Sequence, residues 1–432
     1  MRVACILILL LTLFPWAGLR ADTLDSASTA ILDSATAPAT DTLTAGAPIE
    51  GGAEEGALYP MSPERYEQLV SYSRFVNVWR FVSFFIGLAV LAVILFTGLS
   101  ARFRDWTSGI RWKFFALWAY LVLFLAADYI LWLPFAIYRG FVVEDSYGFM
   151  NQTFMQWWGE GLLGLLISAI VLIAPVWFLY WLLNKLKHWW LWFSIGAIPL
   201  AILAIVVFPV FVDPLFNEFG PLEDKQLESE ILTLAQQAGI EGADVFEVDA
   251  SKQSTKINAY VTGLFGTKRI VLYDTLIKNF TTDEVKFVMA HEMGHYLMNH
   301  MWQGLAVAIL FIMVSLWLAG RLLPVTISRL KDSLHFERLG DYASLPLIAM
   351  YLMIFTFIFQ PITNAASRWM EWQADDYGMR MSGVDGETAA TAFDKLSVFN
   401  LSDPDPGALV EFWFYDHPSL KKRMEFARTW KP

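Results

Sequence analysis

The chain has 432 residues, of which 56% are hydrophobic and 16% aromatic, with a mean hydropathy of +0.45. Soluble domains are about 45–50% apolar, so this excess, concentrated in long runs, favours several membrane spans. The net charge of −11 and the lack of clustered Lys and Arg argue against a nucleic-acid partner. The single cysteine, Cys5, excludes an intramolecular disulfide and a cysteine-based zinc site.

The N-terminal segment 1–21, MRVACILILLLTLFPWAGLRA, has an Arg near its start, a short apolar stretch and small residues at its end. This pattern predicts a secretory signal peptide, with an uncleaved anchor as the alternative. In both cases Arg2 favours the cytoplasm, and the chain from residue 22 onward is exported. Residues 22–62 contain no Lys or Arg and few large apolar residues, which predicts a disordered acidic tail.

Six long apolar segments follow, and each approaches or exceeds the roughly 17–25 residues that cross a bilayer as a helix. Four transmembrane helices are expected within 63–212 and two within 301–363. The segments are 81–99, 114–137, 161–183, 189–212, 302–320 and 345–362.

Charge orients these spans. Loops 100–113, 184–188 and 321–344 fall on one side of the membrane, and loop 138–160 on the other carries only Arg139 beside three acids. The positive-inside rule places the basic loops in the cytoplasm, so the region 213–300 and the C-terminal segment face outward. The expected location is a bacterial inner membrane with the active site on the periplasmic side. The basic side chains are Arg102, Arg104, Arg111, Lys113, Lys185, Lys187, Arg321, Arg329, Lys331 and Arg338.

Residues 213–300 predict a soluble insert between the fourth and fifth spans. LEDKQLESEILTLAQQAGI predicts an amphipathic helix. DVFEVDA predicts a strand, and INAYVTGLFGTKRIVLYDTL predicts further strands joined by a Gly-containing turn. Thr281 and Glu284 fit a capping box at the start of a further helix. That helix carries the stretch HEMGH and is expected to continue into the fifth span.

His291 and His295 are four residues apart and therefore share one face of a helix, where two imidazoles can bind one zinc ion. Glu292 between them can take a proton from water, which is the HExxH arrangement of zinc peptidases. The alternative is a helix whose histidines only hydrogen-bond to neighbours. Met298 and Met301 exclude a metzincin pattern. His300 lies five residues past His295, which turns it away from the shared face and predicts a solvated or interfacial histidine.

A third ligand is expected from the C-terminal segment 364–432. The fifth and sixth spans enter and leave the membrane, so NAASRWMEWQADDYG at 364–378 returns to the face that holds His291. Glu371 can complete a His, His, Glu set, and Asp375, four residues on, can accept a hydrogen bond from the far nitrogen of a ligand imidazole. The alternative for both acids is a helix end with solvated charges.

The stretches HEMGH, SRWMEWQAD and DHPSLKKR, together with DPLFNEFGPL and INAYVTGLFGTKRIVLYDTL, resemble the type I CAAX prenyl protease family over roughly residues 62–427. The resemblance implies a multi-span α-helical membrane protein, a helical barrel enclosing a chamber with a small α+β metalloprotease insert. It implies that His291, His295 and Glu371 are zinc ligands, that Glu292 is the general base and that Asp375 is the partner of a ligand histidine. It also implies that His417 stabilises the oxyanion, that Asn258 lies by the substrate-binding edge strand, and that Arg368 and Arg423 are pairing residues.

The expected function is therefore a membrane-embedded zinc metalloendopeptidase with one Zn²⁺ per chain, in which Glu292 is the general base. The expected partners are the lipid bilayer and a peptide substrate bound in extended form along the edge strand. Two alternatives remain open. One is a broad quality-control protease of membrane or envelope proteins, and the other is a channel or transporter in which zinc is only structural.

Overall fold

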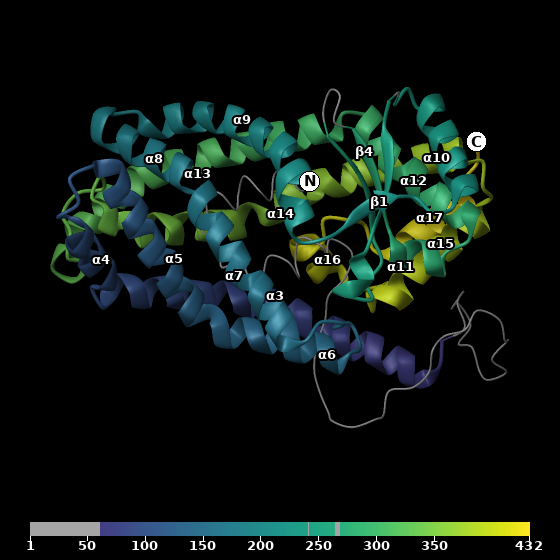
Figure 1. Ribbon diagram of the computed structural model, residues 1–432, viewed down its shortest axis with the longest axis horizontal. Helices are drawn as coiled ribbons and strands as arrows, with labels where there is room; N and C mark the ends of the chain where they lie inside the picture. The colour runs from purple at the N-terminus through teal and green to yellow at the C-terminus, as the bar shows by residue number, and fades with distance from the viewer. Residues whose placement is uncertain (1–60, 241, 264–267) are drawn as a thin grey trace.

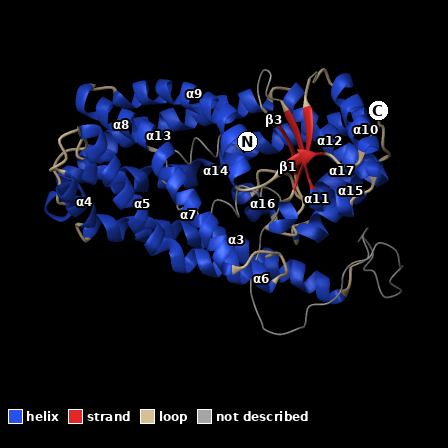
Figure 2. Cartoon of the chain, in the orientation of Figure 1, coloured by secondary structure: helices blue, strands red, loops and turns tan. Residues whose placement is uncertain are grey.

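The computed structural model describes residues 61–240, 242–263 and 268–432 of the chain. The predicted signal peptide, 1–21, and the predicted tail up to residue 60 lie outside the described residues. The described part is elongated, with a helical bundle at one end and a small sheet flanked by helices at the other (Figures 1 and 2).

Six helical segments in the described part are long and apolar enough to cross a membrane, as the sequence predicts. Ser62 caps the first of them, and Thr153 with Gln156 forms a capping box at the third. Proline lies inside several of these helices, which transmembrane helices tolerate. The segments are α3 (Pro63–Phe96), α5 (Lys113–Ile137), α7 (Phe154–Val171) continued by α8 (Ile173–Lys185), α9 (Trp189–Val207), α13 (His300–Leu334) and α14 (Leu345–Ser382).

The three basic loops meet at the end of the bundle opposite the sheet (Figure 1). Short helix α4 (Leu99–Thr107) belongs to the first of these loops. The Arg104 guanidinium pairs with the Asp341 carboxylate at 2.8 Å, and the Asn184 amide donates to the Gly340 carbonyl at 3.0 Å. These two contacts join all three loops, so the basic side chains of these loops lie together at one end of the molecule.

The soluble insert contains a four-stranded sheet in the order β1-β2-β4-β3. The central pair β2–β4 is parallel, and the outer pairs β1–β2 and β3–β4 are antiparallel. Strand β3 therefore forms one edge of the sheet. The predicted amphipathic helix is α10 (Lys225–Gln237), and its buried face includes Leu227, Ile231 and Leu234. The strands are β1 (Phe219–Pro221), β2 (Asp244–Val248), β3 (Ala259–Thr262) and β4 (Arg269–Tyr273).

The insert and the C-terminal segment share one hydrophobic core, separate from that of the membrane bundle. Phe287, on α12, is almost fully buried and meets Phe393 edge-on, with 5.2 Å between ring centroids. Burial of such a ring contributes about 3–5 kcal/mol relative to alanine. This core joins the insert to the C-terminal segment. The helices concerned are α11 (Asp274–Asn279), α12 (Thr282–Leu297), α15 (Gly386–Asn400), α16 (Ala408–Phe414) and α17 (Leu420–Thr429).

The helix that carries HEMGH does not continue into the fifth span, so that prediction is wrong. α12 begins at the predicted capping box of Thr281 and Glu284 and ends at Leu297, and α13 begins anew at His300. Asn299 between them has φ +60°, the left-handed conformation that asparagine tolerates better than most residues. By contrast, α14 is continuous from the sixth span through Glu371 and Asp375.

Candidate metal centre

Two glycines allow α12 and α14 to approach closely. A Cβ added to Gly378 on α14 would lie 3.3 Å from the N, Cα and Cβ atoms of His291 on α12. A Cβ added to Gly294 on α12 would lie 3.0 Å from the Tyr377 ring on α14. Small residues at such crossings let helix backbones pack tightly, and here the crossing brings the histidines of one helix to the carboxylates of the other.

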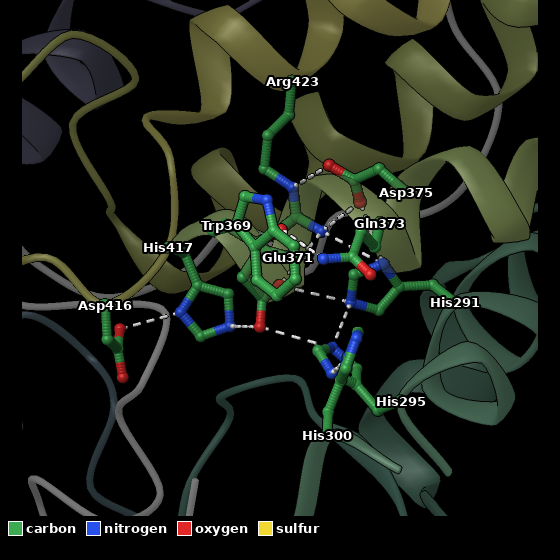
Figure 3. Close-up of polar contacts among 10 residues, drawn as sticks. All are labelled: His291, His295, His300, Trp369, Glu371, Gln373, Asp375, Asp416, His417 and Arg423. Atoms are coloured by element: carbon green, nitrogen blue, oxygen red, sulfur yellow. Dashed lines mark hydrogen bonds and ion pairs between the residues drawn. The ribbon is translucent and has the colours of Figure 1, made fainter. Parts of the chain in front are cut away.

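His291, His295 and Glu371 converge at this crossing (Figure 3). One ligand-type atom from each lies within 4.8 Å of the others. The Nε2 atoms of the two histidines are 3.1 Å apart. The Glu371 carboxylate lies 3.3 Å from Nε2 of His291 and 3.2 Å from Nε2 of His295. The structure thus brings together the three residues that the sequence predicts as ligands.

The donor set fits a divalent metal ion. Two imidazole nitrogens aimed at each other at this distance require a proton or a cation between them, because their lone pairs repel. The Glu371 side chain is only 4% exposed, and its two carboxylate oxygens face Nε2 of His291 and Nε2 of His295. Two histidines and one glutamate form a ligand set typical of catalytic zinc, which keeps a further position open for water or substrate.

The far side of His291 is held by a buried ion pair. Its Nδ1 lies 2.9 Å from Asp375, which in turn accepts two hydrogen bonds from the Arg423 guanidinium, from Nε at 2.9 Å and from Nη2 at 2.6 Å. Burial lowers the pKa of His291, but hydrogen bonds with Asp375 and Glu371 outweigh this effect and raise that pKa to about 9. The sequence predicts this place for Asp375, and it predicts Arg423 as a pairing residue.

His300 is placed differently from the sequence prediction, which was a solvated or interfacial histidine. It is 3% exposed, and its Nδ1 lies 3.0 Å from Nδ1 of His295. In an unbroken helix, a residue five positions on would be turned by about 140° from His295. The left-handed Asn299 ends α12 and turns the chain back, so His300 contacts the side of His295 that faces away from Glu371 (Figure 3).

Glu292 follows His291 on α12, and both residues line one cleft. Its side chain is half-buried and makes no hydrogen bond or ion pair within the described ranges. A carboxylate at the wall of a cleft, next to a metal position, is available to accept a proton from water. Asn258 and Ala259, at the start of edge strand β3, line the same cleft.

His417 reaches the cleft from the C-terminal segment. Its Nε2 lies 3.2 Å from Glu371 and its Nδ1 lies 2.7 Å from Asp416 (Figure 3). Burial lowers the pKa of His417, but the charges of Glu371 and Asp416 outweigh this effect and raise it. Arg368 on α14 donates to the backbone carbonyls of Glu411 and Tyr415 and so fixes the segment that carries His417.

Asn400 is a site-forming residue that the sequence did not single out. Its amide accepts from the backbone N–H of Ile257 at 2.9 Å and donates to the carbonyl of the same residue at 3.2 Å. The side chain is almost fully buried, so these two bonds hold the chain just before Asn258 and β3. No signal in the sequence relates Asn400 to a strand so far away.

Comparison with known proteins agrees with the geometry. Residues 221–431 match peptidase family M48, and residues 58–218 match the N-terminal region of CAAX prenyl proteases, described as five membrane helices. The chain is 33% identical to the uncharacterised metalloprotease YhfN of Bacillus subtilis, over 85% of this chain and 87% of that protein. It is 31% identical to CAAX prenyl protease 1 of Saccharomyces cerevisiae, over 68% of this chain and 67% of that protein.

The fold is also similar to a solved structure. The crystal structure of S. mikatae Ste24p superposes with a TM-score of 0.71 at 25% identity, covering 86% of this chain and 91% of that one. The likeness therefore extends over both the membrane bundle and the insert. The chain belongs to peptidase family M48, among the membrane-embedded metalloproteases of the type I CAAX prenyl protease family.

Proposed function

We propose that this membrane metalloprotease is a zinc endopeptidase whose metal is held by His291, His295 and Glu371. The observation that carries the proposal is the convergence of these three side chains within 4.8 Å at the crossing of α12 and α14. A fourth protein ligand would favour a structural zinc, because structural sites are usually closed. Within the described residues, the set that could hold a metal comprises these three side chains.

When bound, the zinc ion supplies Lewis acidity, which makes water more acidic and polarises the scissile carbonyl. Glu292 accepts the proton that the attacking water loses and delivers it to the leaving amine. His417 donates a hydrogen bond to the oxygen that gains negative charge, a role supported by its position 3.2 Å from Glu371 and by the orienting contact with Asp416. Asp375 and Arg423 hold His291 in one ring orientation.

The substrate is expected to bind in extended form along β3. This strand lies at an edge of the sheet, pairs on one side with β4, and begins beside Glu292 in the cleft. The unpaired edge of a strand offers N–H and C=O groups to an extended peptide. Asn258 lies where such a peptide would pass Glu292, and Asn400 holds the backbone of Ile257, the residue before Asn258.

The site is expected to face away from the cytoplasm, in a bacterial inner membrane. The three basic loops lie together at the end of the molecule remote from the cleft, and the positive-inside rule assigns that end to the cytoplasm. A relative of bacterial origin, from Bacillus subtilis, supports a bacterial source.

Glu292→Gln tests the mechanism. The purified chain and this variant are loaded with zinc, the metal content is measured, and cleavage of unfolded peptides is followed with and without a chelator. The unsubstituted chain is expected to cleave in a chelator-sensitive manner. The variant is expected to keep its zinc and lose activity by at least about 100-fold, since proton transfer by a positioned side chain contributes about 10²–10⁴-fold. Cleavage by a zinc-loaded Glu292→Gln variant at the unsubstituted rate would rule the mechanism out.

A further inference from the structure

Arg80 brings a cation from the first membrane helix to the cleft. It lies midway along α3, directly before the apolar run 81–99, and it lines the cleft together with Asn258, Glu292 and His417. A membrane helix, the edge strand, the general base and the C-terminal segment therefore meet around one space. Neither the zinc site nor the steps assigned to Glu292 and His417 use this arginine.

The Arg80 guanidinium has no carboxylate partner. Across residues 61–240, 242–263 and 268–432, no ion pair joins it to an acid. The guanidinium lies over the face of the Tyr415 ring, 5.4 Å from the ring centroid. Arg423, which lines the same cleft, behaves differently because it pairs with Asp375 through two hydrogen bonds. Burial removes part of the hydration of this guanidinium, and no acid compensates for that loss. An incoming anion can supply the missing electrostatic attraction.

Neither acid that lines the cleft is paired with Arg80. Asp416 is bonded to Nδ1 of His417, and Glu292 forms no ion pair within the described ranges. The lining also includes the apolar side chains Phe287, Phe393 and Leu396. A peptide on β3 would thus meet apolar side chains, a reactive centre and one unpaired guanidinium, whose planar fork is suited to binding a carboxylate with two hydrogen bonds.

We propose that Arg80 forms a carboxylate-binding subsite for the substrate and makes a negative charge near the scissile bond a specificity determinant. The inference rests on the proposed function, because it assumes a peptide on β3. The carboxylate can belong to an Asp or Glu side chain of the substrate or to the substrate's free C-terminus. Both present the same two oxygens to the guanidinium, which lies over the Tyr415 ring.

The test measures binding in full-length, zinc-loaded protein carrying Glu292→Gln, reconstituted in nanodiscs. Fluorescent peptides share one scissile sequence and form matched pairs. One set has Asp or Asn at each position near the scissile bond, and the other has a free or an amidated C-terminus. Hydrogen bonds to charged groups contribute enough that one pair is expected to differ in Kd by about 10- to 100-fold. The set in which that pair occurs identifies the source of the carboxylate.

Substitution of Arg80 decides whether this side chain is responsible. Arg80→Gln is expected to abolish the preference, and Arg80→Glu to transfer it to a peptide with Lys at the same position. Arg74→Gln, an exposed arginine on the same helix that does not line the cleft, is the matched control and is expected to keep the preference. Equal binding of all pairs, or an unchanged preference in Arg80→Gln, would overturn the inference. Cleavage by the chain without Glu292→Gln is measured separately, so loss of the proposed function is distinguishable from loss of the subsite.

Discussion

At the scale of single residues, His291 couples metal binding to pH. In the metal-free site, burial lowers its pKa, but Asp375 and Glu371 raise it further, to about 9. The ring therefore carries a proton at neutral pH, whereas a metal ligand must be neutral. Zinc binding is expected to release about one proton, and the apparent zinc affinity is expected to fall as the pH decreases from 9. Zinc titrations between pH 6 and 8 in buffers of different ionisation enthalpy measure both quantities. An affinity independent of pH would contradict the prediction.

His300 contacts the proposed ligand His295, as Asp375 contacts the proposed ligand His291. Its Nδ1 contacts Nδ1 of His295 at 3.0 Å, and loss of such an orienting partner typically costs 10–100-fold in metal affinity. His300→Phe is expected to release zinc to a chromophoric chelator at least about tenfold faster, while His300→Gln, which keeps a hydrogen-bonding group, is expected to restore much of the retention. The exposed His188, far along the chain in a basic loop, gives the control His188→Phe. Equal release rates for His300→Phe and the unsubstituted chain would show that the contact does not hold the ring.

The sequence predicts the residues whose positions follow from helical spacing. His291 with His295, and Glu371 with Asp375, are each four residues apart on helices that form as expected. The prediction for His300 is wrong because the same spacing argument assumes an unbroken helix, and the left-handed backbone of Asn299 breaks it. The sequence does not single out Arg80 or Asn400. Their importance arises from contacts with Tyr415 and Ile257, which are distant along the chain.

At the scale of secondary-structure elements, the site depends on the distance between α12 and α14. Gly378 sits against the backbone of His291, so an added Cβ meets atoms that can move only with the whole helix. Gly378→Ala is expected to weaken zinc retention and Gly378→Leu to weaken it more, because a larger side chain displaces α12 further. Zinc content after dialysis and the thermal midpoint of the zinc-loaded protein measure the effect.

Gly304 provides the matched control for this series. It is buried in helix α13, but a Cβ added to it meets no atom within 4 Å. Gly304→Ala is expected to leave zinc retention unchanged and to stabilise the helix by about 0.5–1 kcal/mol. If Gly378→Ala and Gly304→Ala retain zinc equally, the crossing of α12 and α14 is more compliant than the close contact implies.

Elements with a strong periodic or apolar pattern are those that the sequence predicts well. The six spans, the amphipathic α10 and the strands β2, β3 and β4 all occur near their expected positions. The order of strands in the sheet is set by long-range pairing, and the local pattern of apolar residues contains no information on it. The continuity of α14 from the membrane into the site does not follow from the local pattern, because the change from apolar to polar residues at 363–364 resembles a boundary between segments.

At the scale of the whole molecule, the basic loops and the cleft lie at opposite ends. The basic loops are tied together by Arg104–Asp341 and Asn184–Gly340, and the cleft lies beside the sheet at the other end. The two ends must face different sides of a bilayer if α3, α5 and their neighbours span it. The positive-inside rule then assigns the basic end to the cytoplasm, which would leave the substrate to arrive from the exterior side.

Cysteine labelling in intact bacterial cells tests this orientation. Ser108 in the first basic loop and Ser229 on α10 are both exposed, and each is replaced singly by cysteine. A membrane-impermeant maleimide is expected to label Ser229→Cys in intact cells and to label Ser108→Cys only after permeabilisation, because the positive-inside rule predicts that the basic end lies inside. The unsubstituted chain, with Cys5 as its single cysteine, gives the background. Labelling of Ser108→Cys but not Ser229→Cys in intact cells would place the cleft in the cytoplasm, and the substrates would then have to be sought among cytoplasmic proteins.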